Sequence, residues 1–158
     1  MTALIDIQNL TKTYTKGLMR KPVAAIRGVS LQVYEGEAFG FVGPNGAGKS
    51  STIRIMMGLS WPSSGRVLLH GVDACDPNSR SRIGYVPENP CLYDYLTPNE
   101  ILEMGMQLHG VRHTAPTAHR LQWLERLGLA EVADAPIRSF SKGMTQRVAI
   151  AHALCIQP

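Results

Sequence analysis

Apolar and polar residues alternate along the first third of the chain, a pattern that predicts β-strands. Residues 4–10, LIDIQNL, alternate as a strand with one buried face does. Residues 23–37, VAAIRGVSLQVYEGE, form a second extended segment that places Val29, Leu31 and Val33 on one face. These two segments predict neighbouring strands at the start of the fold.

Three further segments predict strands from other patterns. Residues 38–43, AFGFVG, have no polar position, which is typical of a strand buried on both faces. Residues 66–71, RVLLHG, and residues 83–87, IGYVP, are short apolar runs next to turn residues. The region before residue 97 is therefore expected to be rich in sheet.

A helical period replaces the alternation in three places. In residues 49–60, KSSTIRIMMGLS, the apolar positions Ile53, Met56, Met57 and Leu59 fall near helical spacing, and WPSSG then ends the helix. Residues 97–110 and 115–129 predict two more helices, each with one apolar face. The expected faces are Ile101, Leu102, Gly105 and Leu108 in the first, and Leu121, Leu124 and Leu127 in the second.

The first of these two helices has a well-defined start. Thr97 precedes Pro98 and lies three residues before Glu100, which is the pattern of a capping box with proline at the first helical position. Gly110 then ends the helix. We divide the chain into a sheet-rich core (1–96), a helical region (97–140) and a last helix (141–158).

Composition narrows the class of protein. The 158 residues are 44% hydrophobic and 18% charged, as expected for a folded domain and not for a disordered chain. No apolar run approaches the roughly 20 residues needed to cross a bilayer, and no leader peptide is visible. Three widely spaced cysteines (Cys75, Cys91, Cys155) favour reduced thiols in the cytosol.

The net charge of +4 does not indicate a nucleic-acid partner. The cations are spread along the chain, apart from one modest cluster. That cluster is interpreted as a solvated loop; it comprises Lys12, Lys16, Arg20 and Lys21. Because no aromatic-interleaved basic stripe occurs, we expect no nucleic acid to bind.

One loop carries the chemistry. Residues 41–52, FVGPNGAGKSST, place a G-x-x-x-x-G-K-S motif between an expected strand and an expected helix. Glycines at 43, 46 and 48 let the backbone approach an anion and point successive N–H groups at it. The helix start adds positive charge, Lys49 is placed for the β- and γ-phosphates, and the Ser50 hydroxyl is placed to ligate Mg²⁺. Chance would produce this motif in about one such chain in a few hundred.

The loop resembles the Walker A motif of ABC-type ATPases. The filling GPNGAGKSST is the form characteristic of that family. The resemblance implies that ATP phosphates are bound by Gly43, Pro44, Asn45, Gly46, Ala47, Gly48, Lys49, Ser50 and Ser51. The lead-in LTKTY resembles the A-loop, so Tyr14 is expected to stack on adenine.

Two downstream segments extend the resemblance over nearly the whole chain. Residues 83–102, IGYVPENPCLYDYLTPNEIL, are similar to the Q-loop region of exporters with separate permease subunits. Residues 139–154, SFSKGMTQRVAIAHAL, resemble the ABC signature and its helix. The implied fold is α/β: a P-loop NTPase with a RecA-like sheet-rich core and a helical signature subdomain.

Both segments depart from the family pattern. Glu88 stands where the family has glutamine, and it is expected to ligate Mg²⁺ and to sense the attacking water. In the signature, lysine replaces the first glycine and methionine replaces the glutamine. The residues expected to contact ATP held by a second subunit are Ser141, Lys142, Gly143 and Met144. An ordinary surface glutamate and an ordinary capped helix are the alternatives for these two sites.

The resemblance also predicts what this chain does and what it does not do. In the family an apolar strand ending in Asp-Glu follows the signature helix, and the sequence stops at Pro158, before such a strand. We therefore expect a chain cut within its domain that binds ATP, hydrolyses it poorly and has exposed apolar strand edges. No residue of the 158 is a firm candidate for the catalytic base.

Function follows as an expectation. The chain is identified as a member of the ABC ATP-binding subunits, which pair head to tail and drive transmembrane permease subunits; export is the expected direction. Its expected place is the cytoplasm, peripheral at the inner face of the plasma membrane. A non-transport ABC protein and a non-hydrolytic nucleotide-binding module stay open as alternatives. A GTPase is excluded because no Asn-Lys-x-Asp motif occurs.

Overall fold

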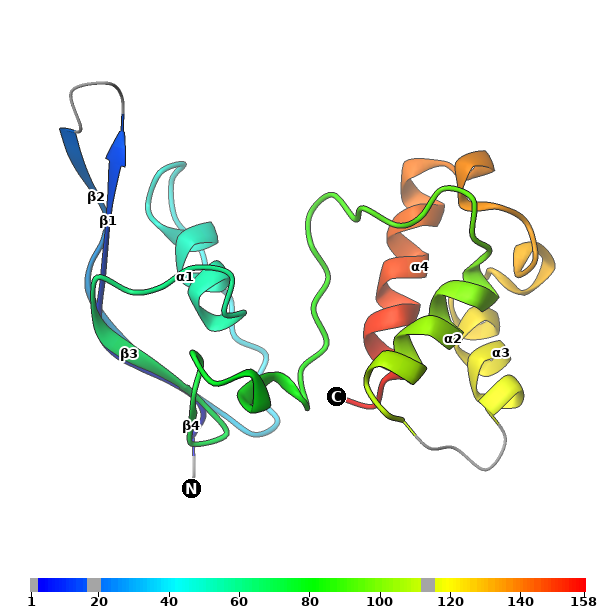
Figure 1. Ribbon diagram of the computed structural model, residues 1–158, viewed down its shortest axis with the longest axis horizontal. Helices are drawn as coiled ribbons and strands as arrows, with labels where there is room; N and C mark the ends of the chain where they lie inside the picture. The colour runs from blue at the N-terminus through cyan, green and yellow to red at the C-terminus, as the bar shows by residue number, and fades with distance from the viewer. Residues whose placement is uncertain (1–2, 17–20, 112–115) are drawn as a thin grey trace. The chain divides into compact units, whose positions relative to one another are not determined.

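The computed structural model describes residues 3–16, 21–111 and 116–158, which form two compact units. The first unit, Met1–Ser81, holds the strands and one α-helix, and the second, Arg82–Pro158, is helical (Figure 1).

A four-stranded antiparallel sheet organises the first unit. Its strands are β1 (Ala3–Lys16), β2 (Lys21–Tyr34), β3 (Ser64–Leu69) and β4 (Val72–Asp73), in the spatial order β2-β1-β3-β4. The first two strands are long partners over most of their length, as Figure 1 shows. The strands expected from residues 4–10, 23–37 and 66–71 are thereby confirmed.

An irregularity in the β1–β2 pairing keeps the apolar residues on one face. Leu10 pairs with Val29 and Lys12 with Ile26, so one strand advances by three residues while the other advances by two. Gly28 takes a left-handed backbone conformation at this point, with φ of 67°, and Asn9, with φ of 47°, lies in the preceding irregularity between Ile7 and Leu10. Because of the bulge, Ile26 and Val33 are both buried although they are seven positions apart, an odd offset that would place them on opposite faces of a regular strand.

Helix α1 (Lys49–Met56) and the 3-10 turn η1 (Pro77–Arg80) complete this unit. Helix α1 lies against β2 and β3, and its Ile55 is 2% exposed. The buried apolar residues of the sheet include Ile7, Leu10, Val67 and Leu69. The expected apolar face of this helix was wrong in part. Leu59 lies after the helix and is exposed, as is Trp61 in the turn that follows.

The described residues of the second unit contain three α-helices and two 3-10 turns. They are α2 (Pro98–Leu108), α3 (Pro116–Arg126), η2 (Ala130–Val132), η3 (Ile137–Ser139) and α4 (Lys142–Cys155). Their core includes Leu102 of α2, Leu124 of α3 and Val148 of α4, each 0% exposed. The two helices predicted for residues 97–110 and 115–129 are therefore confirmed as α2 and α3.

The start of α2 has the predicted chemistry. The Thr97 hydroxyl accepts a hydrogen bond from the Glu100 backbone N–H at 3.2 Å, and the Glu100 carboxylate accepts one from the Thr97 N–H at 2.8 Å. Gly110, with φ of 63°, follows the helix. The predicted faces need two corrections: Met106, not Leu108, completes the buried face of α2, and Leu121 of α3 is 43% exposed.

Two predicted strands do not form. Residues 38–43 and 83–87 are irregular, and the apolar side chains of the first segment are exposed rather than buried: Phe39, Phe41 and Val42. An extended segment needs a neighbouring strand to take its backbone hydrogen bonds. Within the described residues no strand pairs with either segment.

Three smaller findings concern the described residues. None of their helices is long and apolar enough to cross a membrane, and none of their histidine, cysteine or acidic side chains gather in a group of three or more that could hold a metal. Cys75 and Cys91 are exposed, Cys155 is buried, and all three are free thiols, as predicted.

Candidate nucleotide-binding site

The glycine-rich loop makes a tight turn directly before α1. The Ala47 N–H donates to the Pro44 carbonyl at 3.2 Å, which closes the turn around Asn45 and Gly46. Gly46 and Gly48 take φ of 85° and 90°, in the left-handed region that favours glycine. A side chain on Gly46 would meet no atom within 4 Å, so open space lies beside the turn.

Gly48 fixes the loop against the sheet. A Cβ at this position would lie 2.3 Å from the Ala25 carbonyl oxygen of β2, a distance that real Cβ atoms do not reach. Gly43 differs: its φ is not in the left-handed region, and a Cβ there would make an ordinary 3.4 Å contact with Ala47. Gly43 therefore has no left-handed conformation that requires glycine, and its expected close approach to an anion stays a prediction.

Helix α1 begins without a side-chain cap. Gly48 is its N-cap residue, and the first backbone bond within the helix runs from the Thr52 N–H to the Gly48 carbonyl at 2.8 Å. The N–H groups of Lys49, Ser50 and Ser51 therefore precede the helical ladder, where they give a helix start its partial positive charge. No acidic residue lies in the first turn to offset that charge.

The Lys49 side chain folds back over the loop. Its ammonium donates to the Gly43 carbonyl and, at 2.9 Å, to the Pro44 carbonyl. The cation thus lies with the turn and the helix start, a donor set that suits a phosphate chain. Ser50 is exposed at the first turn, where its hydroxyl can meet a cation that a phosphate brings.

Tyr14 connects this loop with β1. Its hydroxyl donates to the Ser51 hydroxyl at 3.4 Å, and the Lys12 ammonium lies over its ring, 4.9 Å from the centroid. Hydrogen bonding with Ser51, and then with Ser60, lowers the pKa of Tyr14. Tyr14, which is predicted to stack on a base, is therefore hydrogen-bonded to α1, the helix whose start is predicted to bind phosphates.

The second unit carries the other predicted residues. Glu88 is exposed at a bend in an irregular segment. Ser141 is the N-cap of α4, and its hydroxyl accepts a hydrogen bond from the Met144 N–H at 3.3 Å. Ser141, Lys142 and Gly143 are exposed, whereas Met144 packs against the helical core.

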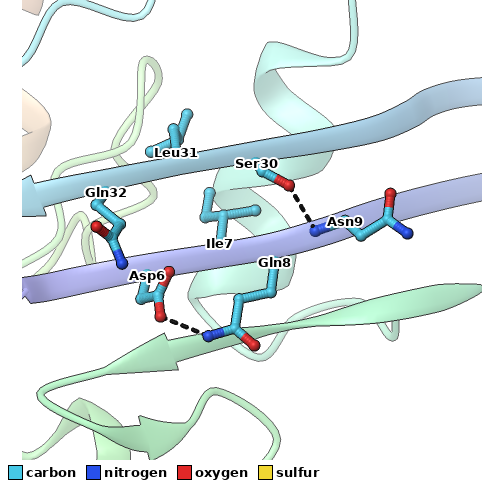
Figure 2. A pocket seen from close by; sticks show the side chains of 7 residues that line it. All are labelled: Asp6, Ile7, Gln8, Asn9, Ser30, Leu31 and Gln32. Carbon is cyan, nitrogen blue, oxygen red and sulfur yellow. Dashed lines mark hydrogen bonds between the residues drawn. The ribbon is translucent and has the colours of Figure 1, made fainter.

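The depression on the sheet is a different feature. It lies on β1 and β2 and is lined by Asp6, Ile7, Gln8, Asn9, Ser30, Leu31 and Gln32 (Figure 2). The polar groups there bond to one another: the Asn9 N–H donates to the Ser30 hydroxyl at 2.8 Å, and Gln8 donates to Asp6. None of the residues predicted to bind nucleotide lines it.

Comparison with known proteins places this arrangement in a family. A model of the ABC transporter family matches residues 26–158. The chain belongs to the ABC transporter family. It is 40% identical to an uncharacterized ABC transporter ATP-binding protein of Nostoc sp., over 99% of this chain and 48% of that protein. It is 34% identical to the linearmycin resistance ATP-binding protein LnrL of Bacillus subtilis, over 98% of this chain and 49% of that protein.

A solved structure of the same family supports the fold. The dimeric ATP-binding cassette MJ0796, in a post-hydrolysis state bound to ADP and Pi, matches with a TM-score of 0.85 at 30% identity. The match covers 98% of this chain and 70% of that one. The fold is thus the α/β fold of ABC ATPase cassettes, as the resemblance implied. The chain spans about half the length of the curated relatives it matches.

Sequence reasoning on this ABC family chain missed two residues near Tyr14. Ser51 was assigned to the phosphates alone, and Lys12 was assigned to a solvated cluster. In the structure Ser51 also accepts from Tyr14, and Lys12 covers its ring. Lys12 and Tyr14 are two apart in a strand and so share a face, which is the one pattern that could have indicated their contact.

Proposed function

We propose that this chain binds MgATP as the nucleotide-binding part of an ABC transporter. The observation that carries the proposal is the start of α1, where uncapped N–H groups, an αL glycine and the Lys49 ammonium lie together with no acidic side chain in the first turn. ABC ATPase cassettes bind ATP, generally with Mg²⁺, and the cassette MJ0796 was solved with ADP and Pi.

Each residue of the loop then has a role. The N–H groups of residues 46–51 would donate to the phosphate oxygens, and Lys49 would exchange its two carbonyl partners for the β- and γ-phosphates. Ser50 would be a ligand of the metal, which on binding neutralises charge that develops on the phosphates. Gly43, Pro44, Asn45 and Ala47 shape the turn, and Tyr14 would stack on the base.

The family resemblance proposes roles for residues of the second unit as well. Glu88 would contact Mg²⁺ and the attacking water. Ser141, Lys142, Gly143 and Met144 would approach the γ-phosphate of ATP bound to a second subunit, so that two chains close head to tail on two nucleotides. Two observations support this proposal. Glu88 and residues 141–143 are exposed, and the related cassette MJ0796 is dimeric.

The proposal extends to transport. We propose that the chain works in the cytoplasm, held at the inner face of the plasma membrane by permease subunits that it drives towards export. The relative named for linearmycin resistance supports that direction, because resistance of this kind is compatible with removal of a toxic compound.

We also propose that residues 1–158 alone bind ATP and turn it over slowly. No Asp-Glu pair occurs among them, and in the family such a pair supplies the metal-holding and water-activating carboxylates. Losing a general base costs about 10²–10⁴ in rate. Turnover by these residues within tenfold of a complete ABC ATPase would contradict this.

Lys49→Ala tests the binding proposal. Removing a charge-assisted contact to a triphosphate is expected to weaken MgATP binding by at least about tenfold, measured by calorimetry. Lys21→Ala is the matched control, since Lys21 is an exposed lysine on β2 far along the sequence from the loop. Equal MgATP affinity in Lys49→Ala and the unchanged chain would refute the proposal.

A further inference from the structure

Lys12 makes two contacts that hold it at Tyr14. Its ammonium donates to the Trp61 carbonyl at 2.5 Å and lies 4.9 Å from the centroid of the Tyr14 ring. The first contact ties the lysine to the turn after α1, and the second is a cation–π contact. Among the described residues, no carboxylate forms an ion pair with Lys12.

Tyr14 is held at a second point. Its hydroxyl bonds to Ser51, which belongs to α1 just after the phosphate loop. Tyr14 is also paired with Val23 of β2, so the ring rises from a paired position near the end of β1. The ring is therefore fixed at its base by the sheet, at its hydroxyl by α1 and at one face by Lys12.

We propose that Lys12 is a positioning residue for nucleotide recognition: it holds the Tyr14 ring in place and covers one ring face, so that a base stacks on the other. This inference rests on the proposed function, because it takes Tyr14 as the stacking surface. A base that stacks on a ring already ordered loses less conformational freedom on binding than one that must order the ring.

A bulk effect of charge is the competing explanation. Lys12 could favour ATP simply as one more cation near a polyanion, in which case it would favour every polyphosphate. A positioning role favours ligands that carry a base and leaves a bare phosphate chain unaffected. ATP and inorganic tripolyphosphate, each with Mg²⁺, therefore distinguish the two explanations.

The test measures the dissociation constants of both ligands by calorimetry on the full chain. Lys12→Met, which keeps the stem and removes the charge, is expected to weaken ATP binding about two- to fivefold and to leave tripolyphosphate binding unchanged. Lys12→Arg, which keeps a cation over the ring, is expected to bind ATP as the unchanged chain does. Lys21→Met is the control for net charge, because Lys21 is an exposed lysine on β2, two residues before Val23, the pairing partner of Tyr14.

A double variant tests the route through Tyr14. In a Tyr14→Ala background, Lys12→Met is expected to change ATP affinity no further, because the ring that it orders is gone. Equal weakening of ATP and tripolyphosphate by Lys12→Met would overturn the inference in favour of bulk charge. Unchanged ATP binding in Lys12→Met would overturn the inference as well. Tighter ATP binding would also overturn it, because it would show that the Lys12 ammonium occupies the ring face that the base needs.

The design separates this inference from the proposed function. Lys49→Ala is expected to weaken both ligands, and if it weakens neither, the phosphate site itself is wrong. If Lys49→Ala weakens both while Lys12→Met weakens neither, the nucleotide site stands and the role of Lys12 falls. Retained tripolyphosphate binding in Lys12→Met also shows that the variant is folded around its loop.

Discussion

Two helices of this chain begin at residues that the family resemblance directs towards ATP, and they begin in different ways. Helix α1 starts at Gly48, which has no side chain and leaves the first N–H groups of the helix without a cap. Helix α4 starts at Ser141, whose hydroxyl already accepts from the Met144 N–H. Lys49 lies over its own loop at the first helix, whereas Lys142 is exposed at the second.

The difference indicates how each helix start is stabilised. At α4 the cap is internal and the helix behind it is anchored in an apolar core, so its start needs no ligand to be formed. At α1 the corresponding N–H groups have no side-chain cap, and the loop is shaped by its glycines and by the Lys49 ammonium, which donates to the Gly43 and Pro44 carbonyls. We infer that the loop before α1 binds an anion directly. We also infer that the start of α4 is already formed without a ligand and contacts an anion that a second subunit binds.

The largest effect is expected at Gly48. Gly48→Ala would force a side chain into the left-handed region and against the Ala25 carbonyl, at a cost of about 2–5 kcal/mol in the free energy of unfolding. Gly46→Ala is the matched control, with a similar φ but no atom within 4 Å, and should cost about 1–2 kcal/mol. Urea denaturation measures both, and equal costs would show that β2 does not constrain the loop.

The anchoring of α4 can be loosened at Gly105. A Cβ there would lie 2.4 Å from Nε2 of His152 on α4, so Gly105→Ala is expected to destabilise the chain by about 1–3 kcal/mol. Adding His152→Ala should recover part of that loss, because it empties the space the new methyl group enters. Trp123 fluorescence in a Trp61→Phe background follows the unfolding of this unit. Strictly additive effects would mean that the two residues do not meet.

Removing the cap of α4 should have a moderate effect. Ser141→Ala is expected to cost about 1 kcal/mol of stability, and Ser141→Gly only a few tenths. MgATP should not reverse the loss, since the cap is internal to the chain. Restoration of stability by MgATP at concentrations that saturate one chain would show that α4, like α1, relies on a ligand it binds directly.

The smallest effect concerns pH. Burial lowers the pKa of His152, and repulsion from His109 contributes less. The unfolded chain therefore takes up a proton near its ordinary pKa of about 6.5, before the folded chain does, and stability falls as pH drops from there to the lowered pKa of the folded state. The effect is modest because the side chain is half-buried. His152→Gln should reduce the change of the urea midpoint with pH across this window. An unchanged dependence of the midpoint on pH would show that His152 is not its cause.

Local chemistry was readable in the sequence, and long-range pairing was not. The capping box of Thr97 and Glu100 spans four residues, and the turn before Lys49 spans six, so sequence neighbours supply every group. Residues 38–43 have the composition of a buried strand, yet a strand exists only beside another strand, which no local pattern supplies. The contacts of Tyr14 with Ser51, and of Lys12 with Trp61, join residues 37 and 49 positions apart and needed the fold.

The placement of apolar residues on helices was predicted less well than the helices themselves. Leu108 and Leu121 fit the period of α2 and α3 but lie outside the buried faces. Met106 is buried in α2 in place of Leu108, whereas Leu124 of α3 is buried as predicted. Periodicity fixes a face to within a residue or two, and the packing partner decides which neighbour is buried. The roles of Glu88 and of Ser141 to Met144 stay predictions, since each concerns a partner outside the chain.

The backbone amide resonances of the two helix starts test the central claim most directly. On addition of MgATP, and equally of magnesium tripolyphosphate, the N–H signals of residues 46–51 are expected to shift, while those of Ser141 to Met144 stay in place as long as the chain is monomeric. If saturating MgATP left the signals of residues 46–51 unmoved, the loop before α1 would not be the phosphate site, and the account would be contradicted.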